Sequence, residues 1–230
     1  MKIAVIPARG GSKRIPRKNI ELFCGKPIIA WSIEAALASG LFDHVVVSTD
    51  DAEIGAVAKK YGAEVPFIRP ANLSDDFVGT SAVIKHAVEW FINNHSRPEY
   101  VCEIYATAPF VRDSDLINSF RIFNEQVVDI VFSVTKYAFP IQRAVRITEQ
   151  GRVEMCQPKH MAERSQDLEE LYHDAGQFYW FTTDAILKRL SVFSVHSVPY
   201  VLPRYRVQDI DTLEDWVQAE LMYKALNDNV

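Results

Sequence analysis

The start of the chain constrains the fold more than any other part, because a β-branched run passes directly into a loop of glycines and cations. Lys2–Pro7 has the sequence KIAVIP, which is typical of a buried parallel strand. The loop 8–19 follows, and apolar residues at helical spacing begin near Pro27 and stop near Gly40. In open α/β sheets, ligands bind where such loops leave the carboxyl ends of strands. We therefore expect an α/β fold with a ligand site at this loop.

The remainder of the chain repeats the alternation of strand and helix. Further strands are predicted at His44–Ser48, 64–67, 100–105, 129–134, 177–181 and 193–201, and further helices at 52–61, 81–93, 114–124, 182–190 and 211–226. This alternation predicts a Rossmann-like, mostly parallel sheet flanked by helices on both faces. After about residue 136 the pattern changes to two short strands, 141–148 and 152–157, around a Gln150–Gly151 turn. We therefore expect one domain over 1–230, with a small antiparallel insertion at about 138–175 that serves as a substrate lid or a subunit interface.

Charge and composition exclude several classes of protein. The net charge of −5 gives no basic surface for nucleic acid, and no apolar run reaches the roughly 20 residues that a membrane span needs. The three cysteines are scattered and lack metal-ligand spacing, so a reduced, cytoplasmic protein is expected. Six cations nevertheless crowd the first eighteen residues without an acid between them: Lys2, Arg9, Lys13, Arg14, Arg17 and Lys18. This cluster indicates a local anionic ligand, although a solvated basic loop is the simpler alternative.

The glycines in this loop favour the ligand interpretation. Gly10 and Gly11 lack a Cβ atom, so their backbone N–H groups can approach an oxyanion. The loop also carries side chains that hold phosphate oxygens, namely Arg9, Lys13, Lys18 and Asn19. The pattern GxxxxGK[ST] of a Walker A loop is absent, and adjacent glycines do not match GxGxxG. ATPase and dinucleotide-dependent oxidoreductase functions therefore lose their main support.

Five segments together resemble a known family. They are IPARGGSKRIPRKNI at 6–20, the helix start GKPI at 25–28, VVVSTDD at 45–51, RPANLSDD at 69–76 and DIDTLEDW at 209–216. Their order over nearly the whole chain is similar to that in the CMP–sugar-acid synthetases, which include the sialic acid cytidylyltransferases. The resemblance implies a fold of the nucleotide-diphospho-sugar transferase type, a CTP substrate, Mg²⁺ as cofactor and a homodimer.

The resemblance also implies roles for particular residues. Contacts to the CTP phosphates would come from Arg9, Ser12, Lys18 and Asn19, and the loop near Asp76 and Thr80 would frame the nucleotide. The complete set of expected nucleotide-binding residues is Ala8, Arg9, Gly10, Gly11, Ser12, Lys18, Asn19, Asp76 and Thr80. Arg9 and Lys18, together with Asp211, are the expected catalytic residues, because they would neutralise charge in the transition state.

Two aspartates near the C-terminus are candidate metal ligands. Asp209 and Asp211 are two residues apart, which places both carboxylates on one side of an extended segment. Hard oxygen ligands beside a triphosphate suit Mg²⁺, and the family resemblance gives both aspartates this role. The alternative is that Asp211 only caps the last helix, and the two roles are compatible. Asp50 is a weaker candidate for a nucleotide or metal contact, because it can equally cap the helix at 52–61.

The second half of the chain is expected to select the acceptor. The segment DAGQFYW at 174–180 stands where sialic acid enzymes carry an Asn-Gly-Ala type of sequence, and it resembles the pseudaminic acid branch of the family. Tyr105 replaces the glutamine that contacts the sugar in those enzymes, which favours a related nonulosonic acid. The expected sugar-binding residues are Tyr105, Arg164, His173, Gln177 and Tyr179. An aromatic run such as Phe178–Phe181 is otherwise typical of a strand in the core.

These observations predict the transfer of CMP from CTP to the anomeric hydroxyl of a small acidic sugar, with release of pyrophosphate. The partners are then CTP and the sugar acid, without nucleic acid or membrane. Neighbouring possibilities are an enzyme for N-acetylneuraminic acid or another sugar acid, and a sugar-1-phosphate nucleotidylyltransferase. A different class of protein, a non-catalytic nucleotide-binding module, would use the same basic loop.

Overall fold

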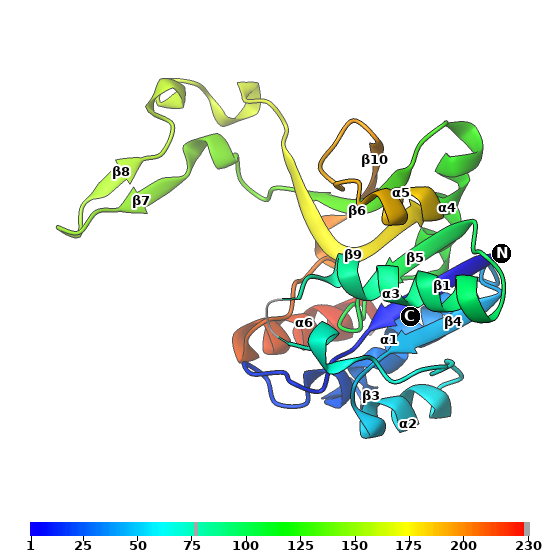
Figure 1. Ribbon diagram of the computed structural model, residues 1–230. Coiled ribbons are helices and arrows are strands. Elements are labelled where there is room, and N and C mark those ends of the chain that lie inside the picture. The colour runs from blue at the N-terminus through cyan, green and yellow to red at the C-terminus, as the bar shows by residue number, and fades with distance from the viewer. Residues whose placement is uncertain (76–77, 228–230) are drawn as a thin grey trace.

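The computed structural model describes residues 1–75 and 78–227, and a six-stranded sheet forms its centre (Figure 1). The strands are β1 (Lys2–Pro7), β4 (His44–Ser48), β5 (Tyr100–Ile104), β6 (Ile130–Lys136), β9 (Tyr172–Thr182) and β10 (Ser197–Leu202). Their order in the sheet is β10-β6-β9-β5-β1-β4. All neighbours are parallel except β9, which runs antiparallel to both β5 and β6. The predicted α/β fold with a mostly parallel sheet is confirmed.

Helices cover both faces of this sheet. One core cluster joins the sheet to α1 (Ile28–Ala38), α2 (Ala52–Lys60) and α4 (Asp113–Glu125). A second cluster on the other face joins it to α3 (Thr80–Asn94) and α5 (Thr183–Lys188). The alternation of strand side chains explains the two clusters, because Val101 of β5 belongs to one and Cys102 to the other. Burial on both faces also explains why these strands are continuous apolar runs in the sequence.

The last helix closes the end of the sheet where the basic loop lies. This helix, α6 (Leu213–Asn227), packs through Trp216 and Ala219 on Phe23 and Ile28. Phe23 belongs to a small hairpin of β2 (Leu22–Phe23) and β3 (Lys26–Pro27), which precedes α1 and was not predicted. The packing brings residues near 210 against residues near 18, so opposite ends of the chain meet at one place.

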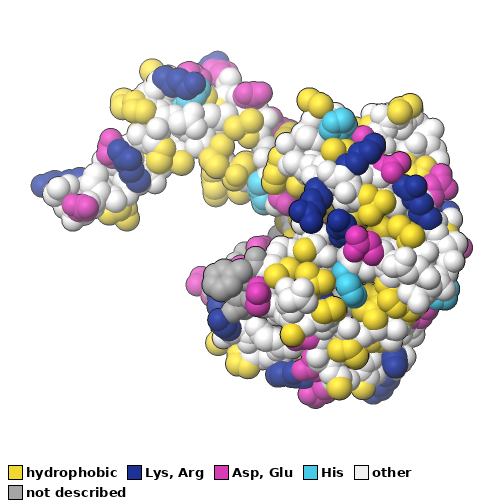
Figure 2. Space-filling model, viewed as in Figure 1, with side chains coloured by type: hydrophobic (Ala, Val, Ile, Leu, Met, Phe, Trp, Pro, Cys, Tyr) yellow, Lys and Arg dark blue, Asp and Glu magenta, His cyan; other side chains and the backbone are white. Residues whose placement is uncertain are grey.

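Between β6 and β9 the chain leaves the body as an arm, residues 137–171. The arm contains the two-stranded sheet of β7 (Val145–Ile147) and β8 (Val153–Met155), with short 3-10 turns Ile141–Arg143, Pro158–His160 and Ser165–Asp167. It projects away from the central sheet (Figure 1), and a hollow separates much of it from the body (Figure 2). The antiparallel excursion was predicted, although both of its strands are shorter than expected.

Outside the arm, three predicted strands differ by several residues from the observed ones. The strand predicted at 193–201 begins only at Ser197. Segment 64–67 forms only a single bridge, Val46 to Glu64, because Pro66 has no N–H group to continue the ladder. Conversely, the strand predicted at 177–181 begins at Tyr172, because β6 pairs with it past a bulge that lies between Phe132 and Val134. Among the described residues, no helix has the length and apolar character that crossing a membrane requires.

Candidate active site

A cavity of about 690 Å³ lies at the carboxyl ends of β1 and β5, below the first turn of α3. Its lining residues come from the basic loop, the segment between α2 and α3, the start of α3, the loop after β5 and the loop before α6. They are Pro7, Arg9, Ser12, Lys13, Arg14, Ile15, Lys18, Asn19, Arg69, Leu73, Asp75, Val78, Gly79, Thr80, Val83, Tyr105, Ala106, Thr107 and Asp211. The structure therefore brings most of the expected nucleotide contacts and Asp211 together. We call this cavity the nucleotide pocket.

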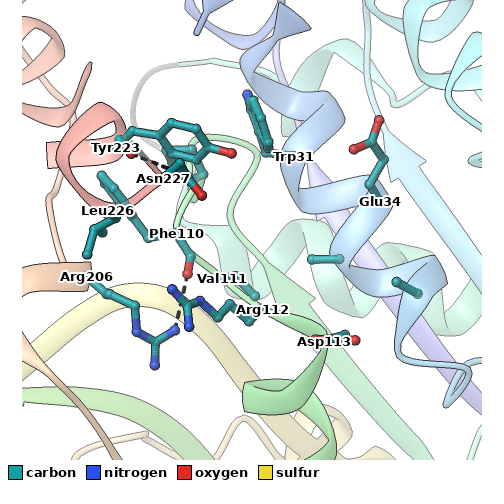
Figure 3. A pocket seen from close by; sticks show the side chains of 13 residues that line it. Trp31, Glu34, Phe110, Val111, Arg112, Asp113, Arg206, Tyr223, Leu226 and Asn227 are labelled. Carbon is teal, nitrogen blue, oxygen red and sulfur yellow. Dashed lines mark hydrogen bonds between the residues drawn. The ribbon is translucent and has the colours of Figure 1, made fainter. Parts of the chain in front are cut away.

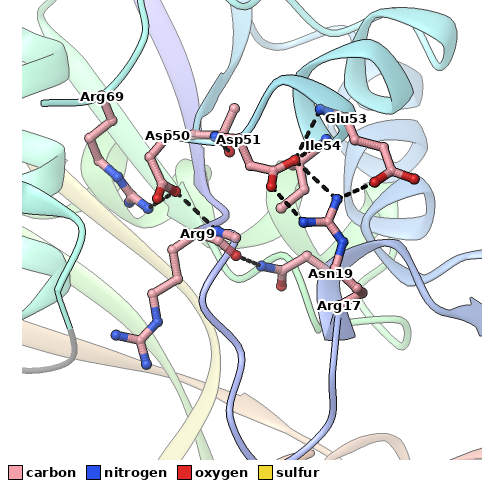
Figure 4. Close-up of polar contacts among 10 residues, drawn as sticks. Arg9, Arg17, Asn19, Asp50, Asp51, Glu53, Ile54 and Arg69 are labelled. Atoms are coloured by element: carbon pink, nitrogen blue, oxygen red, sulfur yellow. Dashed lines mark hydrogen bonds and ion pairs between the residues drawn. The ribbon is translucent and has the colours of Figure 1, made fainter. Parts of the chain in front are cut away.

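Backbone and side-chain hydrogen bonds hold the basic loop in shape (Figure 4). The Gly10 N–H donates to Asp50 Oδ1 at 3.0 Å, and Asn19 Nδ2 donates to the Arg9 carbonyl oxygen at 2.9 Å. A Cβ atom at Gly10 would lie 2.8 Å from Asp51 Oδ2, whereas one at Gly11 would meet nothing within 4 Å. Gly10 is therefore required by the close approach of the loop to the segment after β4. Neither Gly10, Gly11 nor Ala8 lines the pocket itself.

The loop is also fastened by an ion-pair cluster on its outer side (Figure 4). Arg17 donates to both Asp51 carboxylate oxygens, at 2.5 and 3.0 Å, and its guanidinium also contacts Glu53. Asp51 caps α2 by accepting from the N–H groups of Glu53 and Ile54, so the cap of this helix is Asp51 and not its neighbour Asp50. The Arg17 hydrogen bonds lower the pKa of Asp51 to about 2, so this carboxylate stays ionised at neutral pH. It is a structural group rather than a metal ligand in this arrangement.

Arg69 is a pocket residue that the sequence reasoning missed. Its side chain is only 4% exposed, donates through Nε to Ser74 Oγ at 3.2 Å, and pairs with Asp50 at 3.5 Å. Burial lowers the pKa of Arg69, and the nearby Asp50 charge opposes that shift. The signal was available, because Arg69 opens the segment RPANLSDD that carries part of the family resemblance. Asp50 thus orients both Arg69 and the basic loop.

The acidic end of the pocket is built around Asp211. Arg14 Nη1 lies 2.8 Å from Asp211 Oδ2, and Lys18 Nζ lies 3.4 Å from Oδ1. The Lys18 ammonium also donates to the Ile210 carbonyl oxygen at 2.5 Å. Capping of α6 is done by other residues: Thr212 Oγ1 accepts from the Asp215 N–H, while Asp215 accepts from the Thr212 N–H. Asp211 is therefore not needed as the helix cap, and its carboxylate faces the cations of the loop.

Asp209 and Asp211 are the expected ligands of a divalent cation, and of the two only Asp211 is among the described residues that line the nucleotide pocket. Partial burial and the neighbouring Asp211 charge raise the pKa of Asp209, as expected for two acids in proximity. Within 1–75 and 78–227, however, no group of three or more His, Cys, Asp or Glu side chains is arranged to hold a metal. Mg²⁺ commonly uses one or two carboxylates and completes its octahedron with water and phosphate oxygens. The donor set therefore suits Mg²⁺ together with a nucleotide.

Beyond Tyr105, a polar network extends from the pocket along β9. The Tyr105 and Tyr179 rings lie 5.5 Å apart, and the Tyr179 hydroxyl donates to Asp174 Oδ1 at 2.7 Å. Burial and the Glu103 carboxyl raise the pKa of Tyr105 to about 12, so this hydroxyl remains protonated and able to donate. The Gln177 amide is buried beside these rings and donates to the Ala175 carbonyl oxygen at 3.1 Å. Tyr105, Tyr179 and Gln177 thus come together as expected, and Asp174 joins them.

Other expected site residues lie elsewhere. Arg164 is on the arm and forms a bidentate pair with Asp167, at 2.6 and 3.0 Å, and it does not line the nucleotide pocket. His173 lies at the base of the arm, where its ring packs 4.8 Å from the Tyr137 ring and contacts the Asp174 carbonyl oxygen. Asp76 is outside the described residues. A role for Arg164 in sugar binding remains a prediction.

A second hollow, of about 320 Å³, lies between α1, α6 and the loop after β5 (Figure 3). Trp31 and Tyr223 form one side of it, with ring centroids 4.6 Å apart. Its buried cation, Arg206, is already paired with both oxygens of Asp115, at 2.7 and 3.0 Å. The nucleotide pocket therefore suits a triphosphate better than this hollow does, because more of its positive charge is not neutralised by acids.

Comparisons with known proteins agree with this geometry. The model of the family described as cytidylyltransferase matches residues 3–225. The chain is 48% identical to a pseudaminic acid cytidylyltransferase of Campylobacter jejuni subsp. jejuni serotype O:2, over 97% of this chain and 96% of that protein. It is 34% identical to a CMP-N,N'-diacetyllegionaminic acid synthase of Legionella pneumophila, over 95% of this chain and 94% of that protein.

A solved structure with similar architecture is that of a CMP:2-keto-3-deoxy-manno-octonic acid synthetase complexed with CTP. Its TM-score is 0.70, with 98% of this chain and 99% of that chain covered. The sequence identity is only 17%, so this likeness concerns the fold.

Proposed function

Because this chain belongs to the cytidylyltransferase family, we propose that it transfers CMP from CTP to the anomeric hydroxyl of a nonulosonic acid, and that this acid is pseudaminic acid. The acceptor oxygen attacks the α-phosphorus of CTP, the bond to the β-phosphate oxygen breaks, and pyrophosphate leaves. The observation that carries the choice of acceptor is the 48% identity, over 97% of this chain, to a protein named for that activity. The two products are then CMP-pseudaminic acid and pyrophosphate.

The nucleotide pocket supplies what the nucleotide half of this reaction needs. Arg9 and Lys18 bring positive charge to the phosphates from the loop after β1, and Ser12 adds a hydroxyl group at the same wall. Asn19 orients the loop through its hydrogen bond to the Arg9 carbonyl oxygen. Arg69, fixed by Asp50 and Ser74, presents a preorganised cation. Catalysis is then chiefly positioning and charge neutralisation, because phosphoryl chemistry of this kind leaves little covalent work to the protein.

We assign Asp209 and Asp211 as the residues that would hold Mg²⁺. When bound, Mg²⁺ supplies charge neutralisation at the triphosphate and orients its oxygens. Arg14 and Lys18 already balance the Asp211 charge, at 2.8 and 3.4 Å, so the site is stable without a cation. Lys18 belongs to the phosphate-binding loop and contacts Asp211, so it can exchange its carboxylate contact for a phosphate oxygen.

For the acceptor, we propose the polar network at Tyr105. Its protonated hydroxyl and the Tyr179–Asp174 pair form a wall that can hydrogen-bond the hydroxyl and amide groups of a sugar. In this network Tyr105 stands where a sialic acid enzyme is expected to have a glutamine. This replacement supports an acceptor other than N-acetylneuraminic acid.

The test is pyrophosphate release from CTP, with pseudaminic acid and N-acetylneuraminic acid offered separately, each with Mg²⁺ and with EDTA. We expect magnesium-dependent release with pseudaminic acid and at least tenfold less with N-acetylneuraminic acid. Equal release with both acids would refute the acceptor assignment and leave the cytidylyl transfer standing. Binding of CTP without release for any sugar acid would support a non-catalytic nucleotide-binding protein instead.

We also propose that the chain forms a homodimer through the arm. Phe139, Ile147 and Val153 are 82%, 78% and 72% exposed, and Figure 2 shows apolar side chains along the arm. A two-stranded hairpin cannot bury its own apolar side chains, so a second surface is needed to cover them. A second copy of this chain, as the family resemblance implies, would supply that surface and bring Arg164 toward the partner's site.

Sedimentation of a paired variant tests the dimer. Ile147 and Val153 are cross-strand neighbours, so Ile147→Asp with Val153→Asp places two charges on one apolar patch. We expect this variant to sediment as a monomer. The matched control removes the adjacent Arg146–Glu154 pair, an exposed ion pair at 3.0 Å, by serine substitution and should remain dimeric. A wild-type chain that is monomeric at micromolar concentration would contradict the proposal.

A cytoplasmic location is part of the same proposal. Cys24, Cys102 and Cys156 are all free thiols, which suits a reducing compartment. Fractionation of cells that express the full chain, with blotting of each fraction, tests this point.

A further inference from the structure

A smaller cavity of about 170 Å³ lies on the other side of the first turn of α3, between α3, β5, β9 and α5. The helices α3 and α5 lie on the same face of the sheet (Figure 1). Six of the side chains that line this cavity are apolar: Ala82, Ile84, Phe181, Ala185, Ile186 and Leu190. An apolar cavity near this size takes a molecule as large as benzene. We call it the Glu103 cavity, after the acid in its lining.

Glu103 is an unusual residue for this place. It stands in the middle of the central sheet on β5, is 3% exposed, and its Oε1 atom has no hydrogen-bond partner among the described residues. A buried carboxylate oxygen without a partner is costly, and a water molecule needs two to four polar partners to stay there. The apolar walls offer few such partners. A ligand that carries a hydrogen-bond donor on an apolar chain would donate to Glu103 Oε1 and would also pack against the apolar walls.

The remaining lining groups are basic or polar. Lys85 and Arg189 are the two cations of the lining, and Ser81 adds a hydroxyl group. Lys85 Nζ lies 3.5 Å from Glu89 Oε1 in a partly exposed i,i+4 pair, a weak contact that a better anion can replace. The cavity therefore combines an acceptor on a buried strand, apolar walls, one cation on α3 and a second directly after α5.

We propose that the Glu103 cavity is a second ligand site, which takes a short aliphatic molecule with an ammonium or hydroxyl group at one end and a carboxylate at the other. The donor end binds Glu103, the chain packs on the apolar walls, and the carboxylate meets Lys85 and Arg189. This site is separate from the proposed CTP site, because the two cavities share no lining residue among the described residues, whereas Glu103 is the cross-strand neighbour of Tyr179 in the proposed acceptor network.

A ligand bound in the Glu103 cavity should change the affinity of the nucleotide pocket for CTP. Gly79, Thr80 and Val83 line the nucleotide pocket, whereas Ser81, Ala82 and Ile84 line the Glu103 cavity, so one helical turn is the wall between the two. The Thr80 side chain also interacts with the Glu103 carboxyl group and lowers its pKa. A ligand that draws Glu103 toward its donor changes this interaction. We therefore expect the affinity for CTP to change by about fivefold or more when the cavity is occupied.

The experiment uses the full chain and three probes of increasing length, 4-aminobutanoate, 5-aminopentanoate and 6-aminohexanoate, measured by calorimetry and by NMR shifts. Pentanoate lacks the donor and pentylamine lacks the acid, so they are matched controls. We expect at least one of the amino acids to bind about tenfold more tightly than either control, because each control loses one charge-assisted contact. Failure of all three to bind at millimolar concentration, or equal binding of the controls, would overturn the proposal.

Two variants separate the two ends of the site. Glu103→Leu should abolish the preference for the donor, and it removes a buried polar group rather than creating one, so the fold is retained. Arg189 has a left-handed backbone conformation, with φ of 55°, so Arg189→Gly removes the cation without backbone strain. We expect this second variant to weaken binding roughly threefold. Unchanged probe binding in Glu103→Leu would refute the site, and probe binding that leaves CTP affinity unchanged would refute the coupling.

Discussion

Replacement of Glu103 by glutamine tests the energetics of the buried acid in the central sheet. Burial raises the pKa of this carboxyl group from 4.5 to about 7, and the Thr80 hydrogen bond opposes part of the shift. In the unfolded chain the group regains its ordinary pKa. Between these two values the folded protein holds a proton that the unfolded chain releases, so stability falls as pH rises through this range.

The size of the effect follows from the shift. Each pH unit between 4.5 and about 7 removes about 1.4 kcal/mol from the free energy of unfolding, which amounts to about 3 kcal/mol over the window. Glutamine has nearly the same shape and no proton to lose. Glu103→Gln should therefore match the wild-type chain at about pH 4, apart from a constant offset, and exceed it by about 3 kcal/mol at about pH 8.

Urea unfolding of the two proteins at both pH values measures this difference. Other titrating groups cancel in the comparison, because they are common to both proteins. Glu125→Gln, an exposed substitution at the end of α4, is the matched control for the loss of one carboxyl group. A difference between wild type and Glu103→Gln that is the same at both pH values would refute the assignment of a buried, proton-binding carboxyl group.

Three further outcomes are expected. Asp211→Ala should lower magnesium-dependent turnover by roughly 10²–10³ with an unchanged circular dichroism spectrum, since Thr212 and Asp215 cap α6; normal turnover would sink the metal assignment. Gly10→Ala should cost roughly 1–3 kcal/mol in unfolding free energy, whereas Gly11→Ala should be tolerated, since only the first Cβ meets Asp51 at 2.8 Å; equal stabilities would contradict the close approach. Arg69→Lys should raise the KM for CTP about tenfold, because an ammonium cannot bridge Asp50 and Ser74 as the guanidinium does, and an unchanged KM would remove Arg69 from the site.

The order of the elements and the position of the basic loop were predictable from the sequence. The run KIAVIP, the loop with Gly10 and Gly11, and the caps near Asp51 are local signals, because each depends on residues within a few positions of one another. The same holds for the antiparallel excursion around Gly151. Local backbone preferences and the periodicity of apolar residues are sufficient to detect such features.

Contacts between distant segments were not predictable in this way. The role of Asp50 as the anchor of both Gly10 and Arg69 joins residues 40 and 19 positions apart. The strand β9 could be recognised from its aromatic residues, but its antiparallel place between β5 and β6 depends on which strand edges remain open after the parallel strands have paired.

Asp211 illustrates the division between the two kinds of information. The spacing of Asp209 and Asp211 indicated a metal site, whereas the helix start directly after Asp211 indicated that this residue caps the helix. The sequence alone was compatible with both roles. Only the packing of α6 on the β2–β3 hairpin brings Asp211 to Arg14 and Lys18 and leaves the cap to Thr212 and Asp215. The sequence determined the local chemistry that is available at each position. The tertiary structure decided which groups meet, because pairing across nearly 200 residues depends on the packing of the whole chain and not on its local pattern.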